Sequence, residues 1–154
     1  MMVGAAVGRT PSFWAKAMAL NATQWRCLLM SLLLLPAIDI SLRALGFRRT
    51  VALLARLAIP RVLELRRQED ADANVDRIAR VVRIAGRRSL WRASCLRQAL
   101  CLWFLLARRG VASQVRIGVE KPSSSEFAAH AWVERHGQVL IGGDKVQERY
   151  VVLL

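Results

Sequence analysis

Three residues in the C-terminal half of the chain have the types and the order of a nucleophilic triad. Cys95 is followed 35 positions later by His130, and Asp144 comes 14 positions after the histidine. A thiolate attacks a carbonyl carbon, an imidazole holds the thiol proton, and a carboxylate fixes the tautomer and orientation of the imidazole. The pattern therefore predicts covalent catalysis by a Cys-His-Asp site.

The sequence around Cys95 predicts that the thiol lies at the start of a helix. Apolar residues recur at three- and four-residue steps between Leu96 and Ala107, and Gly110 is a natural helix end. Ser94 is the candidate N-cap, which places Cys95 in the first helical turn. Unpaired backbone N–H groups and the helix dipole favour a negatively charged sulfur at that position.

Whether Asp144 reaches His130 depends on the register of a predicted hairpin. A two-residue loop at 136–137 puts the two side chains on opposite faces of the sheet. A three-residue loop, or a bulge at the glycine pair 142–143, puts them on the same face. Glu134, four residues after His130 on the same strand face, is the weaker candidate for the acid.

Each member of the triad also has a structural interpretation. Cysteine is among the most buried residue types, so Cys95 alone would indicate packing. His130 alone would indicate a hydrogen-bonded core histidine, and Asp144 alone a turn residue. Their order and their placement on fitting elements favour catalysis.

The remaining cysteines and histidine are expected to be structural. Cys101 lies six residues after Cys95, about 240° around the helix, so it points into the core. Cys27 belongs to an apolar helix, and His136 belongs to an exposed turn. Trp132 shares a strand face with His130, and it either lines the substrate site or packs in the core.

The elements that must position the triad follow from periodicity. The first half is predicted to be helical, with an acidic loop at 69–74, and a strand-rich part follows, with a connecting loop at 122–125. The predicted fold class is α+β, a nucleophile-bearing helix packed on a small antiparallel sheet. We expect one compact domain, with a helical region at 1–86 and a catalytic core at 87–154. The expected helices are Trp14–Leu20, Trp25–Leu45, Arg48–Leu57 and Asp70–Ile84, and the expected strands are Val115–Val119, Phe127–Glu134, Gln138–Ile141 and Tyr150–Leu153.

Several stretches together resemble the leader peptidases of lasso-peptide biosynthesis. The most specific are Cys-Leu-x-x-Ala-Leu at 95–100 and Ala-His-Ala-Trp-Val-Glu at 129–134, supported by 105–111 and 115–119. The resemblance is close over about 90–150 and looser at 42–49. These peptidases belong to the transglutaminase-like branch of the papain-like cysteine protease superfamily.

The resemblance implies a function in the maturation of a ribosomally made peptide. Family members cut the leader from the precursor peptide, and a separate ATP-using macrolactam synthetase then closes the ring. The nucleophile corresponds to Cys95, the base to His130 and the acid to Asp144; a threonine near the end of the leader would be a recognition feature. The length and helical start resemble the split form, which needs a separate small leader-binding protein.

Composition agrees with a cytoplasmic enzyme of one domain. The chain has 154 residues, of which 55% are hydrophobic, enough for a packed core. Three cysteines without paired spacing argue against a disulfide framework, and two histidines argue against a zinc site. No signal peptide and no Gly-rich phosphate loop is found, so no cofactor is evident and the sequence leaves ATP dependence open.

The charge balance is strongly basic, with 24 Lys and Arg against 11 Asp and Glu, for a formal net charge of +13. Such a balance attracts anionic partners. The arginines are spread over several predicted helices, and no nucleic-acid-binding signature accompanies them, so no nucleic-acid partner is expected. Solvated helix faces explain most of the charge.

The apolar run at 27–37 raises the question of a membrane. It is about a dozen residues long, shorter than the roughly 20 that a spanning helix needs; Pro36 breaks it and Asp39 flanks it. We expect a core helix or a partner-facing helix. Peripheral membrane contact remains open, because an apolar helix beside basic ones also has this pattern.

Three other functions compete with a peptidase. Acyl transfer uses the same site, with an amine in place of water. A non-catalytic scaffold would show no dependence on Cys95. A basic membrane- or nucleic-acid-binding protein would show steep salt dependence.

Overall fold

The computed structural model describes residues 22–58, 69–88, 94–120, 128–143 and 145–153. The predicted helix Trp14–Leu20 and the predicted loop at 122–125 lie outside these ranges, as does Asp144. The elements in chain order are α2 (Ala22–Leu57), α3 (Glu69–Arg88), α4 (Cys95–Ala107), β1 (Gln114–Glu120), β2 (Ala129–Arg135), β3 (Gln138–Ile141), α5 (Val146–Arg149) and β4 (Tyr150–Val152).

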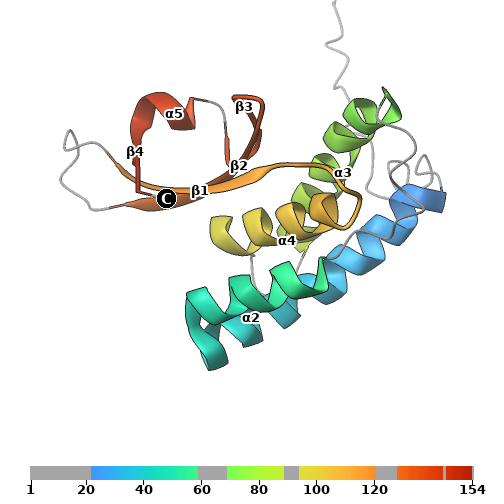
Figure 1. Cartoon of the computed structure of the whole chain (residues 1–154), viewed down its shortest axis with the longest axis horizontal. Coiled ribbons are helices and arrows are strands. Elements are labelled where there is room, and N and C mark those ends of the chain that lie inside the picture. Colours follow the sequence, from blue (N-terminus) through green and yellow to red (C-terminus); the bar gives the residue numbers. More distant parts are fainter. Residues whose placement is uncertain (1–21, 59–68, 89–93, 121–127, 144, 154) are drawn as a thin grey trace, which may run out of the picture.

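The helices and the sheet form separate layers (Figure 1). The four strands are antiparallel in the order β3-β2-β1-β4. Helix α4 lies between α2 and the sheet, and α5 lies on the opposite side of the sheet (Figure 1). This arrangement confirms the predicted α+β class, with the cysteine-bearing helix packed on a small antiparallel sheet.

Helix α4 forms the centre of the core because it is apolar on nearly every side. Leu100, Leu102, Leu105 and Leu106 are almost fully buried. The helix ends at Ala107, and Gly110, the predicted helix-ending glycine, follows with φ 71°. The Gly110 N–H donates to the Ala107 carbonyl and the Val111 N–H to the Leu106 carbonyl, which is the bond pair of a Schellman motif.

The hairpin of β2 and β3 settles the register question up to Ile141. Arg135 pairs with Gln138, so the loop has the two residues His136 and Gly137, both with positive φ as in a type I′ turn. The register then shifts between Val133 and Glu134, which pair with Ile141 and Val139, so Leu140 is an extra residue in β3. This bulge exchanges the sheet faces to which the following residues of the strand belong. The bulge therefore exists, but it precedes the glycine pair at 142–143.

Helix α2 is longer than the apolar run in the sequence suggests. It continues through Pro36 and is interrupted only at Gly46, where φ is 76°, as expected from two predicted helices, 25–45 and 48–57. By length and composition alone, Gln24–Leu57 could cross a membrane. The sequence argument against a membrane span rested on the short apolar run at 27–37, and the length of the helix does not support that argument.

Helix α2 contributes one face to the core and leaves another exposed. Leu28, Leu35 and Ile38 are buried, whereas Leu33 and Ile40 are exposed. The prediction of a core helix is therefore correct for one face. Peripheral membrane contact stays a prediction.

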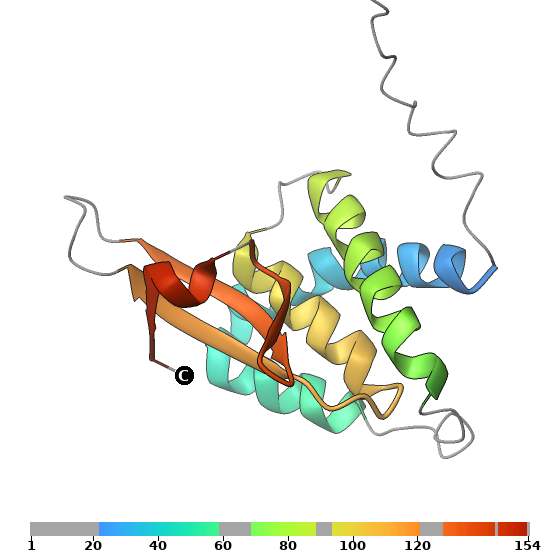
Figure 2. The same ribbon diagram turned by 90° about the horizontal axis from the view of Figure 1, so that it is seen from above.

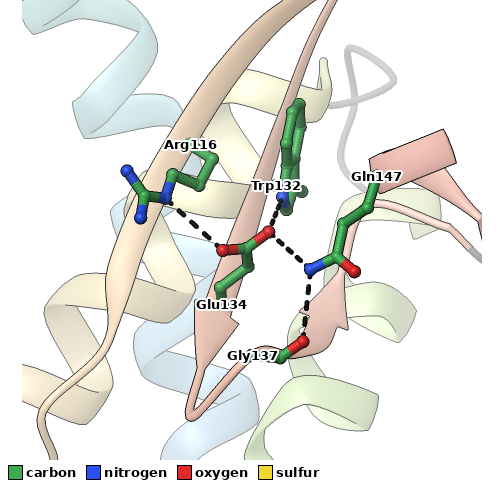
Figure 3. Close-up of polar contacts among 5 residues, drawn as sticks. All are labelled: Arg116, Trp132, Glu134, Gly137 and Gln147. Atoms are coloured by element: carbon green, nitrogen blue, oxygen red, sulfur yellow. Dashed lines mark hydrogen bonds and ion pairs between the residues drawn. The ribbon is translucent and has the colours of Figure 1, made fainter. Parts of the chain in front are cut away.

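The short helix α5 was not predicted. Its four residues are fewer than a periodicity window can detect, and it begins after Lys145, whose φ is 62°. Its residue Gln147 donates a hydrogen bond to Glu134 of β2, the strand that also carries His130 (Figure 3).

Candidate active site

The start of α4 is anchored to α2 through a chain of polar side chains. Ser94 occupies the N-cap position and Cys95 is the first helical residue, as predicted. The Ser94 hydroxyl does not cap the helix; it accepts a hydrogen bond of 3.2 Å from Arg97 Nε. Arg97 in turn pairs with Asp39 of α2 at 3.1 Å. The position of the Cys95 thiol is therefore tied to the helical layer.

Cys95 and His130 line the same cavity. Its volume is about 440 Å³, within the range of small-ligand pockets. The cavity lies where the start of α4, the C-terminal half of α3 and the end of β3 meet, and Figure 2 shows α3 beside α4, with β3 at the edge of the sheet toward α3. Its lining consists of Arg83, Arg87, Cys95, Gln98, His130, Val139, Leu140, Ile141, Gly142 and Gly143.

His130 reaches this cavity because β3 covers only part of β2. The ladder between the two strands joins residues 133–135 to 138–141, so the chain beside His130 is the segment after β3 rather than the strand itself. The His130 Nε2 atom lies 2.6 Å from the Gly142 carbonyl oxygen. A carbonyl oxygen only accepts, so Nε2 carries the proton and Nδ1 of the neutral ring is an acceptor, the form that a general base requires.

The imidazole of His130 is also held by two aromatic rings. It stacks on Tyr150 at a centroid distance of 5.1 Å and on Trp132 at 6.4 Å. Trp132 is fully buried and is not among the residues that line the cavity, so of its two predicted roles the structural one fits. Cys95 and His130, both in the described part of the chain, are not joined by a hydrogen bond; catalytic hydrogen bonds often tighten only when substrate binds.

Gly142 is needed where it lies. Its φ of 128° is outside the range that L side chains favour, and a Cβ atom there would overlap Trp132 Cβ. Only glycine therefore brings this carbonyl to His130 without moving the tryptophan.

Glu134 holds the sheet together rather than the imidazole (Figure 3). Its Oε1 accepts hydrogen bonds from Trp132 Nε1 at 2.7 Å and from Gln147 Nε2 at 2.8 Å, and its Oε2 lies 3.4 Å from Arg116 Nε. Burial opposes ionisation, but these three donors outweigh it and keep the pKa of Glu134 below its usual value. Glu134 thus links β1, β2 and α5.

The other two cysteines are unsuited to nucleophilic attack. Burial raises the pKa of Cys101 to about 12, against a smaller opposing effect of its hydrogen bond with Ser31. Cys27 is buried, and its sulfur lies 2.9 Å from Arg109 Nη2. His136 is exposed in the hairpin loop. These placements confirm the structural interpretation of all three residues.

Of the three predicted catalytic residues, Cys95 and His130 line one cavity, and Asp144 lies outside the described residues. The catalytic roles of all three stay predictions. Sequence reasoning missed the Gly142 carbonyl as a partner of His130, and Arg83, Arg87 and Gln98 as lining residues. The only signals available for them were the glycine pair at 142–143 and the four-residue spacing of the two arginines.

Within the described residues no group of three His, Cys, Asp or Glu side chains could hold a metal ion. The arrangement itself, a partly buried thiol at a helix start and an imidazole of fixed tautomer at one cavity, suits covalent attack on a carbonyl carbon.

Comparison with known proteins agrees with this fold and site. A family model described as the transglutaminase-like superfamily matches residues 41–154, well over half of the chain, and this range includes both Cys95 and His130. Searches of curated proteins and of solved structures gave no match. On the extent of the family match, the chain belongs to the transglutaminase-like superfamily.

Proposed function

We propose that this protein is a cysteine peptidase that removes the leader from a ribosomally made lasso precursor peptide. The superfamily includes cysteine peptidases and acyl transferases. The observation that carries the proposal is the cavity shared by Cys95 and His130, with the proton of His130 held on Nε2 by the Gly142 carbonyl. That bond leaves Nδ1 as the basic nitrogen of the site.

In the proposed mechanism, His130 Nδ1 takes the thiol proton and the Cys95 sulfur attacks the carbonyl carbon at the junction of leader and core. The tetrahedral intermediate collapses as the imidazolium protonates the leaving amine of the core peptide, which leaves a thioester on Cys95. Water deprotonated by His130 then hydrolyses the thioester and releases the leader acid. The Cys95 backbone N–H, in the first turn of α4, is the candidate donor to the oxyanion.

The lasso precursor is supported by the sequence resemblance at 95–100 and 129–134. In this proposal the protein acts in the cytoplasm on a precursor held by a separate small leader-binding protein. An ATP-using macrocyclase then joins the freed amine to a side chain. The partly buried thiol of Cys95 and the fixed imidazole of His130 favour an active enzyme over a scaffold.

The test is mass spectrometry of a lasso precursor incubated with the protein and its leader-binding partner. We expect the wild type to release the leader, and Cys95→Ala and His130→Ala to lose at least about 99% of the rate, because removal of a nucleophile or base typically costs 10²-fold or more. Cys101→Ala is the matched control: it removes a buried thiol of the same helix that faces away from the cavity.

The masses of the products also separate hydrolysis from acyl transfer. A leader with a free carboxylate indicates water as the acceptor, whereas a leader joined to an added amine indicates an acyl transferase. Release of leader by Cys95→Ala at the wild-type rate would refute the proposed mechanism.

A further inference from the structure

One wall of the Cys95–His130 cavity is basic. Arg83 and Arg87 project from successive turns of α3, both side chains are exposed, and both line the cavity. The described lining residues include no carboxylate, and Gln98 is the polar neutral side chain among them. Two positive charges thus border the cavity that holds the thiol and the imidazole.

Some arginines of the described residues have structural partners. Arg97 pairs with Asp39, and Arg109 donates to the Leu105 carbonyl. Among the residues that the structure describes, neither Arg83 nor Arg87 has a hydrogen-bond or ion-pair partner. Their guanidinium groups are therefore available to a ligand that enters the cavity.

We propose that Arg83 and Arg87 form a carboxylate-binding subsite that selects peptides with an acidic side chain close to the scissile bond. The inference rests on the proposed peptidase function and names a determinant of its specificity. A guanidinium offers paired N–H donors in the geometry of a carboxylate, and such charge-assisted bonds are stronger than neutral ones. Both arginines line the same cavity as Cys95, and an extended peptide advances about 3.3 Å per residue, so the acidic residue falls within roughly three residues of the cleaved bond.

Helix α3 supplies a control for the general effect of a basic surface. Arg80 is exposed on the same helix, one turn before Arg83, and does not line the cavity. If the arginines acted only through the net charge of +13, removing Arg80 would matter as much as removing Arg83 or Arg87.

The experiment uses paired peptides that span the cleavage site of the precursor, with Asp or Asn at each of three positions on either side. We expect the wild type to cleave the Asp peptide at least about tenfold faster in kcat/KM at one position, since a hydrogen bond to a charged group has about this effect. R83Q/R87Q should reduce that ratio to within about twofold, and R80Q should retain it.

The same ratio in R83Q/R87Q as in the wild type, or no preference for Asp at any position, would overturn the subsite. Binding of the same peptide pairs to the Cys95→Ala protein, followed by fluorescence anisotropy, decides the matter without turnover. Tighter binding of an Asp peptide that is lost in Cys95→Ala/R83Q/R87Q supports the subsite, and equal binding of the pair refutes it. Failure of the peptidase function appears separately, as absence of cleavage that depends on Cys95.

Discussion

At the scale of single residues, the imidazole of His130 is constrained from two directions. The Gly142 carbonyl fixes its proton on Nε2, and the rings of Tyr150 and Trp132 fix its plane. In a catalytic triad, a side-chain carboxylate fixes the tautomer of the histidine. In this protein the main-chain carbonyl oxygen of Gly142 makes the contact that fixes the tautomer of His130. The orientation of His130 therefore depends on the backbone path after β3.

Replacement of Gly142 tests this dependence. Gly142→Ala places a Cβ against Trp132 and at a φ of 128°, so the carbonyl must shift away from His130. We expect kcat to fall at least about tenfold with little change in KM, because a misoriented His130 slows the proton-transfer step and leaves substrate binding unchanged. Gly143→Ala is the matched control: its φ is also positive, at 109°, but its Cβ would meet only the Val146 side chain at ordinary contact distance. Equal losses in both variants would mean that backbone strain, not the carbonyl, is responsible.

The three cysteines are predicted to differ in reactivity. Cys95 is partly exposed at the cavity, whereas Cys27 and Cys101 are buried and burial raises the pKa of Cys101 to about 12. Iodoacetamide should therefore label one thiol of the native protein, and peptide mapping should locate it at Cys95. All three should react after unfolding in urea. Labelling of Cys101 in the native state would contradict the packing of α4.

At the scale of elements, the start of α4 depends on its connection to α2. Asp39 is paired with both Arg97 and Arg43, at 3.1 and 3.2 Å. The Arg97 side chain is only 13% exposed, whereas that of Arg43 is 76% exposed. Breaking a buried pair costs more than breaking a surface pair, because a charge is left without compensation in the interior.

These two arginines make a matched comparison. Arg97→Gln should lower the free energy of unfolding by about 3 kcal/mol, the cost of breaking a buried ion pair. Arg43→Gln should lower it by less than about 1 kcal/mol, as exposed pairs do. Urea denaturation measures both. Equal losses would indicate that the connection of α4 to α2 rests on apolar contacts instead.

The elements also show how far the sequence could predict the fold. Periodicity predicted α4 because its apolar pattern is long, and it predicted the four strands from alternating or apolar runs between turn signals. It missed α5, which has too few residues for a pattern, and it predicted an acidic loop at 69–74, where α3 is already helical from Glu69. The helix break at Gly46 was predicted, because glycine separates two periodic segments there.

The site was predictable where residue type carries the chemistry. Cys95 and His130 stand out by type, order and context. The Gly142 carbonyl has no residue identity to recognise, and Arg83 lies on a helix whose packing against the cavity depends on tertiary structure. Sequence reasoning offered a bulge at 142–143 as one alternative for the hairpin register, but the bulge occurs before Ile141, because bulge positions depend on how neighbouring strands twist.

At the scale of the whole molecule, Glu134 connects three elements on the side of the sheet away from α4. Its pKa is lower in the folded protein than the ordinary value of 4.5, so it contributes stability that is fully present above that pH. The contribution is lost as pH falls through the lower folded value, where the carboxylate takes up a proton and its donors lose their charged partner. Acid should therefore weaken the contacts among β1, β2 and α5.

A comparison of the wild type with Glu134→Gln measures this contribution. The wild type should be the more stable protein near pH 7 in urea denaturation, and its advantage should shrink as the pH falls below 4.5. The amide keeps one acceptor oxygen for Trp132 but loses the charge that attracts Arg116. A difference between the two proteins that does not change with pH would show that the carboxylate is not the source of the stability.

The central claim is that Cys95 is the nucleophile, and trapping its thioester tests that claim most directly. The protein, its leader-binding partner and a lasso precursor are mixed, quenched in acid within the first turnover, and mapped by mass spectrometry. The account predicts a mass gain equal to the leader peptide minus one water, located on Cys95, present in Cys101→Ala and absent in Cys95→Ala. An adduct on Cys27 or Cys101, or leader release by Cys95→Ala at the wild-type rate, would contradict it.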